Sequence, residues 1–420
     1  MVIREMLNHR AFYRVVPVMS LALVAVAIIG TLGCKHGQKQ VTKKPPVPGQ
    51  AVGRPSELLV TRPTVTTLAA TFDKLPSPAT KRKQLNALAL SGGGQYAAFN
   101  AGLLLGWTSS GQRPSFDAVT GVSSGALVGL YAFLGPKYDG RLQYFFTTLQ
   151  DKDIFQYRPV RELLNHGAIA NPDRMKKLLE TEINECMMMD IQDAHKEGRR
   201  LYVATMNLKT RRPCIWDIGA IACSGRPDAA ELVRKVSMAA AAIPGLLPSV
   251  SFEYEVDGQR FTEEHVDGGA STQTFLRLGP GAEKPNDGEA LWLKGSNLYA
   301  MAAGKLDPPL LKDDPGFVRR LTSTISAALY ALYRSELMGL YAFSSASGMK
   351  FHMLAIPNDA EVPPNSTTFD PKAMKKLFAL GYDMAKESIP WRLTPPDGES
   401  GEETPTRDAT DLLPLPPKKK

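Results

Sequence analysis

The segment FDAVTGVSSGALVG, residues 116–129, joins an apolar run to a glycine-serine turn and then to a second apolar stretch. A short apolar run that ends at a glycine is typical of a buried strand, and the stretch ALVGLYAFLG that follows predicts a helix. A sharp connection of this kind places its serine at the edge of a sheet, beside the N-terminus of the helix. The segment therefore predicts one strand–turn–helix unit of an α/β fold.

A second strand–turn–helix unit is predicted upstream, and further strands and helices are predicted downstream. LNALALSGGG (85–94) predicts a second strand ending in glycines, and YAAFNAGLLLGW (96–107) predicts the next helix. Two such units in succession indicate a parallel sheet with right-handed crossovers. Further strands are predicted at RLYVATMNL, CIWDIG, NLYAMAAG and KFHMLAIP, and a hairpin at FEYEVDGQRFTEEHVD. Further helices are predicted at DAAELVRKVSMAAAA, within residues 316–340, at DPKAMKKLFALGYDMAKE, and after Asn171 as N-cap with Pro172 in the first turn.

The turn in the first segment selects one of its two serines. A serine hydroxyl is a weak nucleophile and needs a positioned base, together with donors for the oxyanion that forms when it attacks an ester. The GxSxG frame is complete around Ser123, which Gly121 and Gly125 flank, whereas Ser124 has neither glycine. Ser123 is therefore the candidate nucleophile, and the alternative is an ordinary glycine-serine turn.

The upstream glycine cluster is a candidate anion site. The N–H groups of Gly92, Gly93 and Gly94 lie at a predicted helix N-terminus, where successive amides can bind a negative charge. A phosphate-binding loop is a weaker interpretation, because no GK[ST] follows and Ala97 takes the last glycine position of a GxGxxG pattern. The three amides are therefore predicted to form an oxyanion hole.

Histidine is the first expectation for the base, and a carboxylate is the alternative. Asp267 ends a predicted strand and precedes Gly268 and Gly269, a turn from which a side chain can project freely. A carboxylate serves as a general base when burial raises its pKa towards the working pH. The histidines of the predicted folded part are His166, His195, His265 and His352, and a lone histidine is more often structural than catalytic.

The motifs SGGG, GxSxG, AAAAIPGLLPSV and DGG, in this order, resemble those of the patatin-like phospholipases. The resemblance implies an α/β three-layer sandwich with a mainly parallel central sheet flanked by helices, a core domain at 85–276, and its C-terminal part at 277–393. It also implies lipid acyl hydrolysis by a Ser123/Asp267 dyad with Gly92, Gly93 and Gly94 as oxyanion hole, without metal or cofactor. Membrane lipid is the implied substrate.

Two departures from the family pattern bear on the substrate. The family usually has a basic residue and then glycine after the glycine cluster, where this chain has Tyr96 and Ala97. Many members also have Asn and Pro soon after DGG, whereas ASTQTF follows here. These differences concern how an anionic substrate or the oxyanion loop is held.

Two other functions stay open on the sequence. One is an α/β-hydrolase esterase with a Ser123/Asp267/His352 triad, whose chain order is allowed although His352 lies inside a predicted strand. His265 lies two residues before Asp267 and therefore on the same strand face, and it is a weaker candidate for the base. The other is a catalytically silent lipoprotein that binds a lipid or a partner.

The N-terminus, residues 1–34, has the order of a secretory signal: basic residues, the uncharged apolar stretch 15–33, and then Cys34. Its ending TLGC resembles a bacterial lipobox, although Thr31 departs from the usual Leu. We therefore expect Cys34 to be lipidated, with an uncleaved signal anchor as the alternative. By the same resemblance, the next residue, Lys35, favours an outer-membrane lipoprotein of the cell envelope that faces the periplasm or the surface.

The excess positive charge behind the formal net charge of +8 lies at the two ends of the chain. Residues 1–60 carry a net +6 and residues 418–420 a further +3, so the rest is close to neutral and no nucleic-acid partner is predicted. Residues 35–80 are rich in Pro and Lys and predict an extended tether, and residues 394–420 predict a disordered tail.

Overall fold

The computed structural model describes residues 84–158, 168–256, 259–279, 291–307 and 316–396. The predicted signal and lipidation site (1–34), the predicted tether (35–80) and nearly all of the predicted tail lie outside these residues. Within them, no helix combines the length and the apolar character needed to cross a bilayer.

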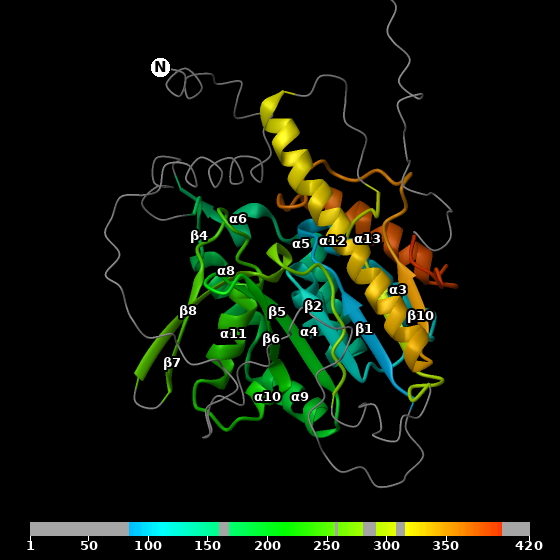
Figure 1. Ribbon diagram of the computed structural model, residues 1–420, viewed down its shortest axis with the longest axis horizontal. Coiled ribbons are helices and arrows are strands. Elements are labelled where there is room, and N and C mark those ends of the chain that lie inside the picture. Colours follow the sequence, from blue (N-terminus) through cyan, green and yellow to red (C-terminus); the bar gives the residue numbers. More distant parts are fainter. Residues whose placement is uncertain (1–83, 159–167, 257–258, 280–290, 308–315, 397–420) are drawn as a thin grey trace, which may run out of the picture.

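One eight-stranded sheet forms the centre of the described structure (Figure 1). Its strands follow the order β10-β9-β1-β2-β5-β8-β7, with β6 beside β5. Their bounds are β1 Asn86–Leu90, β2 Ala118–Val122, β5 Arg200–Asn207, β6 Arg212–Asp217, β7 Val250–Val256, β8 Gln259–Asp267, β9 Asn297–Met301 and β10 Lys350–Leu354. The five strands from β10 to β5 pair in parallel. The pairs β5–β6, β5–β8 and β7–β8 are antiparallel. The predicted α/β fold with a mainly parallel sheet is confirmed.

Helices cover both faces of this sheet. The bounds are α3 Ala97–Ser109, α4 Ser124–Leu134, α5 Asp139–Thr148, α6 Asp151–Ile154, α8 Asp173–Glu182, α9 Glu185–Lys196, α10 Ile218–Ala222, α11 Ala229–Ala240, α12 Phe317–Ser347 and α13 Pro371–Ala385. A small second sheet pairs β3 Gln156–Tyr157 with β4 Ala170–Asn171.

Alternation along β1 shows how the three layers form. Leu88 and Leu90 point into the larger core, which also contains buried residues of α3, α4 and α13. Ala87 and Ala89 point to the opposite face, where they pack in a separate core with buried residues of α12. Because both faces are covered, the strand is apolar from Ala87 to Leu90, as parallel strands of layered α/β proteins are. Figure 1 shows α12 crossing one face of the sheet, with α3 and α13 behind it.

Several element boundaries differ from the prediction. The helix predicted within residues 316–340 continues to Ser347, where Gly348 ends it in the left-handed region at φ 80°. The helix predicted after Asn171 starts one residue later, with Pro172 as N-cap, although Asn171 Oδ1 still accepts a hydrogen bond from the Asp173 amide at 2.8 Å. Helices α5, α6, α9 and α10 were not predicted.

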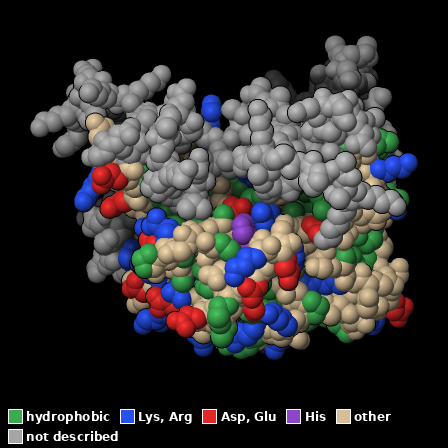
Figure 2. Space-filling view, turned by 90° about the horizontal axis from the view of Figure 1, so that it is seen from below, with side chains coloured by type: hydrophobic (Ala, Val, Ile, Leu, Met, Phe, Trp, Pro, Cys, Tyr) green, Lys and Arg blue, Asp and Glu red, His purple; other side chains and the backbone are tan. Residues whose placement is uncertain are grey.

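Charges of both signs mix on the surface seen in Figure 2. This face corresponds to the lower end of Figure 1, and its Lys and Arg side chains lie among Asp and Glu side chains. Among the described residues visible there, the two signs are interspersed.

The two edges of β5 determine where β2 and β8 meet. On one edge, β6 pairs with residues 202–207 of β5. The other edge is shared: β2 pairs with residues 200–204, and β8 pairs with residues 205–207 in the opposite direction. Val122 is the partner of Ala204, and Asp267 is the partner of Thr205. The carboxyl ends of β2 and β8 therefore face each other end to end.

Candidate active site

The turn after β2 holds Ser123 in a strained backbone conformation. Its φ of 53° and ψ of −130° are unusual for a residue with a side chain, and such geometry costs about 1–3 kcal/mol. A Cβ on Gly121 would lie 2.5 Å from the carbonyl oxygen of Gly125, and one on Gly125 would lie 2.4 Å from that of Ser91. The two glycines that frame the predicted nucleophile are therefore required by close backbone contact. Ser124, the other serine, begins α4.

Asp267 lies opposite Ser123, as the end-to-end meeting of β2 and β8 dictates. Ser123 Oγ donates a hydrogen bond to Asp267 Oδ2 at 2.6 Å. The other carboxylate oxygen, Oδ1, accepts from the Gly269 amide at 2.8 Å, and the Asp267 amide donates to the carbonyl oxygen of Ala242 at 2.9 Å. Asp267 is thus held through its backbone amide and through Oδ1, and Oδ2 is left for the serine.

Burial changes the acidity of Asp267. The residue is 4% exposed, and removal from water raises the pKa of its carboxyl group from 3.8 to about 6. The hydrogen bonds from Ser123 and Gly269 act in the opposite direction and are the smaller effects. A carboxylate with a pKa near 6 is ionised at neutral pH and yet basic enough to accept a proton from a hydroxyl in a transition state.

The Gly92–Gly94 turn packs directly against the serine turn. A Cβ on Gly92 would lie 2.9 Å from Ser123 Cβ and 3.6 Å from its Oγ. Gly94 has a φ of 54°, a region that glycine adopts without a steric penalty. None of the described residues accepts a hydrogen bond from the three amides of this turn. The turn thus offers backbone donors beside Ser123 Oγ.

Replacing Gly92 by alanine is expected to lower kcat about 100-fold through displacement of Ser123, because a misplacement of about 1 Å can cost that much. The added methyl group would meet the Cβ of the nucleophile at 2.9 Å, a contact that neither group can avoid by rotating. Steady-state kinetics and thermal unfolding of the Gly92→Ala variant would measure this. The exposed Gly140 in α5, where a Cβ meets nothing and the backbone is helical, provides the control as Gly140→Ala. Parental kcat in Gly92→Ala would show that the turn does not constrain the serine.

The position of the family's usual basic residue is occupied by a half-buried phenol. The Tyr96 hydroxyl donates to the carbonyl oxygen of Pro363 at 2.5 Å. Burial, assisted by Tyr330, raises the pKa of Tyr96 to about 12, so the side chain is neutral. Beside it, the buried Gln95 side chain donates to Asn365 and accepts from the Asp370 amide. Here the turn is held by neutral hydrogen bonds to the segment before α13.

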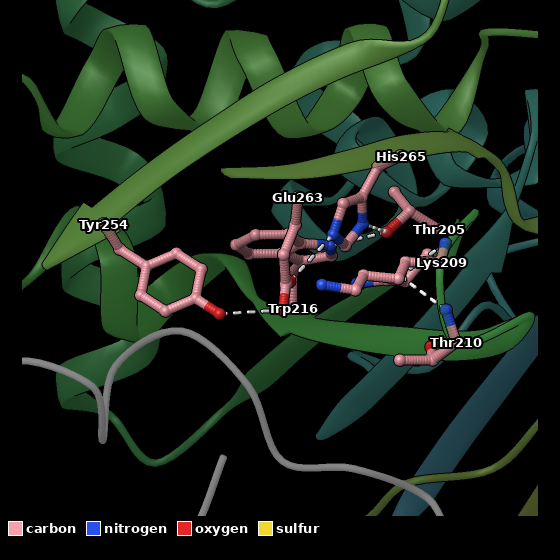
Figure 3. A network of polar contacts seen from close by, with 8 residues as sticks. Thr205, Lys209, Thr210, Trp216, Tyr254, Glu263 and His265 are labelled. Atoms are coloured by element: carbon pink, nitrogen blue, oxygen red, sulfur yellow. Dashed lines mark hydrogen bonds and ion pairs between the residues drawn. The ribbon is translucent and has the colours of Figure 1, made fainter. Parts of the chain in front are cut away.

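His265 belongs to a polar network that does not include Ser123. The ring is fully buried, with Nδ1 2.8 Å from Thr205 Oγ1 and Nε2 3.3 Å from Glu263 Oε2 (Figure 3). Trp216 Nε1 donates to the same threonine oxygen at 2.8 Å, and the Tyr254 hydroxyl donates to Glu263 at 2.9 Å. Because the Glu263 carboxylate can only accept, Nε2 donates to it, and in the neutral ring Nδ1 then accepts from the Thr205 hydroxyl. Both ring nitrogens are therefore engaged within the sheet.

His352 lies in β10, three strands away from β2. Its ring stacks on Tyr299 with centroids 4.9 Å apart, and it contacts Asn297 through Nε2. In the parallel register it lies level with Val119, four residues before Ser123. At about 4.8 Å per strand, this places it roughly 14 Å to the side. The structure brings Asp267 to Ser123 and brings neither His265 nor His352.

Residues outside the predicted motifs hold both turns of the site. A Cβ on Gly93 would lie 2.0 Å from the carbonyl oxygen of Ala303, after β9, and Ser91 Oγ accepts from the Ala303 amide at 2.9 Å. Glu336, in α12, accepts hydrogen bonds from the segment after DGG. Sequence reasoning missed these contacts, and the departure ASTQTF was the only local signal near one of them.

A cleft of about 700 Å³ lies elsewhere, between α8, α11 and the start of β7. Its lining includes Lys176, Glu231, Arg234 and Met238, and contains neither Ser123 nor Asp267. The cleft mixes charges of both signs. Among the described residues, no group of three His, Cys, Asp or Glu side chains is arranged to hold a metal ion.

Known proteins that are similar to this chain include solved structures and a protein family. Among solved structures, VipD from Legionella pneumophila is similar over 72% of this chain and 66% of its own, at 11% identity and a TM-score of 0.34. The type III effector protein ExoU is similar over 72% of this chain and 52% of its own, at 12% identity and a TM-score of 0.24. The chain thus spans less than two thirds of either. The comparison with curated proteins gives no match. The family model for patatin-like phospholipases matches residues 88–277, and the chain therefore contains a patatin-like phospholipase domain.

Proposed function

We propose that the protein is a membrane-tethered serine acyl hydrolase that cleaves carboxylic ester bonds of phospholipids or related lipids. The observation that carries the proposal is the 2.6 Å hydrogen bond from Ser123 Oγ to Asp267 Oδ2, in a domain of the patatin-like phospholipase family. The strained serine turn, the buried carboxylate and the adjacent glycine amides supply a nucleophile, a base and oxyanion donors.

In the first half of the proposed reaction, Ser123 Oγ attacks the ester carbonyl carbon while its proton passes to Asp267 Oδ2. The carbonyl oxygen becomes an oxyanion, which accepts hydrogen bonds from the amides of Gly92, Gly93 and Gly94. When the tetrahedral intermediate collapses, the bond to the alcohol oxygen breaks and Asp267 returns the proton to that oxygen. The products of this half are the free alcohol, a lysolipid where the substrate is a phospholipid, and an acyl-serine.

In the second half, water replaces the alcohol. Asp267 accepts a proton as the water oxygen attacks the acyl carbon, and it returns that proton to Ser123 Oγ when the acyl bond breaks. A fatty acid leaves and the serine is restored. The same carboxylate thus acts as base and then acid in each half, and no third residue is needed to orient it because the Gly269 amide already does so.

The dyad is favoured over a triad with His352 by position. His352 lies three strands from β2, and both nitrogens of His265 face Thr205 and Glu263. We expect His352→Ala and His265→Ala to keep kcat within about tenfold of the parent as long as they are folded, since neither ring takes the serine proton. Fatty-acid release from phospholipid vesicles, measured by mass spectrometry, tests both the activity and the variants.

The outcomes of this assay separate the functions. Fatty-acid release together with labelling of Ser123 by a fluorophosphonate supports the proposal. A folded protein that neither releases fatty acid nor reacts with the probe would be the silent lipoprotein. Loss of turnover in His352→Ala alone would restore the triad.

The membrane tether is proposed from the N-terminal sequence. Cys34 after the apolar stretch 15–33 is the lipidation site in this proposal, and the Pro- and Lys-rich residues 35–80 would hold the catalytic part near a bilayer, with the cell envelope as location. Mass spectrometry of the mature N-terminus tests it. A diacylglyceryl-modified Cys34 is expected, and an intact Met1 would contradict lipidation.

A further inference from the structure

The Glu336 carboxylate in α12 binds three consecutive residues of the loop that follows DGG. Its Oε1 accepts from Thr272 Oγ1 at 2.7 Å, and its Oε2 accepts from the amides of Gln273 and Thr274 at 2.8 and 2.9 Å. Hydrogen bonds to an ionised acceptor are stronger than those between neutral groups. More than 60 residues separate Glu336 from this segment in sequence, so the contact joins α12 to the loop through tertiary structure alone.

This segment continues directly from the turn that orients Asp267. The short 3-10 helix Gly268–Ala270 begins at Asp267, and the Ser271 and Thr272 amides both donate to the carbonyl oxygen of Gly268 at 2.9 Å. The Gln273 side chain donates to the carbonyl oxygen of Gly269, whose amide in turn binds Asp267 Oδ1. Successive residues and single hydrogen bonds thus connect residues 272–274 to Asp267. The position of the Asp267 carboxylate is therefore tied to the point where Glu336 holds residues 272–274.

The same face of α12 also reaches the other turn of the site. Tyr333, one helical turn before Glu336, is buried and lies beside the Ser91 side chain. Ser91 immediately precedes Gly92 and also binds Ala303. One rigid helix thus contacts the residues that flank the oxyanion glycines and those that follow the proposed base. This helix lies outside residues 88–277, which the family model matches.

We infer that Glu336 is a positioning residue for hydrolysis: it acts through residues 272–274 to hold Asp267 against Ser123. This inference rests on the proposed function, since it assigns Glu336 to that same site. Glu336 does not touch the reacting atoms. Its carboxylate anchors the loop in the segment ASTQTF, where the chain departs from the common family sequence.

Two substitutions at Glu336 distinguish positioning from general stabilisation. Glu336→Ala removes the acceptor from all three donors and is expected to lower kcat about 10- to 100-fold with KM within about twofold, because the base shifts while substrate contacts stay. Glu336→Gln keeps a carbonyl oxygen for the two backbone amides, and its NH₂ can donate to Thr272 Oγ1, so kcat is expected to recover to within about threefold of the parent.

The experiment compares these variants in the full chain with Ser335→Ala, an exposed neighbour on α12, as control. Kinetics on phospholipid vesicles are combined with circular dichroism and with hydrogen exchange of the peptide that contains residues 273 and 274. Faster exchange there and lower kcat in folded Glu336→Ala, with rescue by Gln, support the inference.

A folded Glu336→Ala enzyme with kcat within twofold of the parent would overturn the inference and leave the proposed function intact. The inference would also be overturned if the activity of Glu336→Ala fell only in proportion to its unfolded fraction, or if only its KM changed. An inactive parent would instead remove the proposed function, and the inference with it.

Discussion

Ser123→Ala is expected to abolish turnover, with kcat on a phospholipid ester reduced by about 10⁴- to 10⁶-fold, as for the loss of a serine nucleophile in other hydrolases. The alanine cannot form the acyl-enzyme, while the glycine amides that stabilise the oxyanion remain. Residual activity would then reflect the oxyanion hole and substrate binding alone. Fatty-acid release and intact-protein mass spectrometry after fluorophosphonate treatment would measure the two consequences, turnover and covalent labelling.

Ser124→Ala is the matched control for this variant. Ser124 is adjacent to Ser123 and buried, and its hydroxyl has no hydrogen-bond partner among the described residues. The substitution removes the hydroxyl group and keeps the Cβ, and removing a buried hydroxyl that has no partner is nearly neutral or slightly stabilising. We therefore expect near-parental kcat and an unchanged or higher Tm. If Ser124→Ala were inactive and Ser123→Ala active, the assignment from the glycine frame would be wrong.

Local sequence patterns predicted the parts of the site that local geometry determines. The frame around Ser123 follows from a steric requirement, because side chains at Gly121 or Gly125 would collide with backbone atoms. Asp267 could be predicted because a strand ending at two glycines leaves its side chain free to project. Their meeting at 2.6 Å depends on how β2 and β8 share one edge of β5, and that pairing cannot be read from either segment alone.

Other features depend on contacts between distant segments and left little trace in the sequence. Glu336 appears as an ordinary polar position in an amphipathic helix, and only the fold brings it to the loop after DGG. Tyr96 departs from the family pattern, and the hydrogen bond to Pro363 that fixes it comes from a segment without a recognisable motif. His265 precedes Asp267 closely enough to suggest a base, yet its partners in β5 and β8 engage the ring elsewhere.

Asp267→Asn is expected to lower kcat by about 10²- to 10⁴-fold, the usual contribution of a general base. The parent needs Asp267 ionised to accept the serine proton. With a pKa of about 6, kcat/KM in the parent should therefore fall roughly tenfold per pH unit below about pH 6 and level off above it. The residual activity of Asp267→Asn should lack this acid limb. A pH–rate profile between pH 4.5 and 8.5 on a soluble, uncharged ester would measure both; an unchanged limb in Asp267→Asn would assign it to another group.

The same substitution is expected to stabilise the protein at neutral pH. Because burial raises the pKa of Asp267 from 3.8 to about 6, the folded state binds the proton more tightly than the unfolded state. Stability from this group is thus fully present below about pH 4 and is lost as pH rises to about 6, a cost of about 3 kcal/mol for the ionised form. Asparagine avoids that cost, and it can accept from Gly269 and donate to Ser123. Denaturant unfolding of both proteins should therefore show a stability gain in Asp267→Asn that grows between pH 4 and 6. The exposed Asp193→Asn on α9 is the control, and equal stability of parent and Asp267→Asn at pH 7.5 would show that ionised Asp267 imposes no such cost.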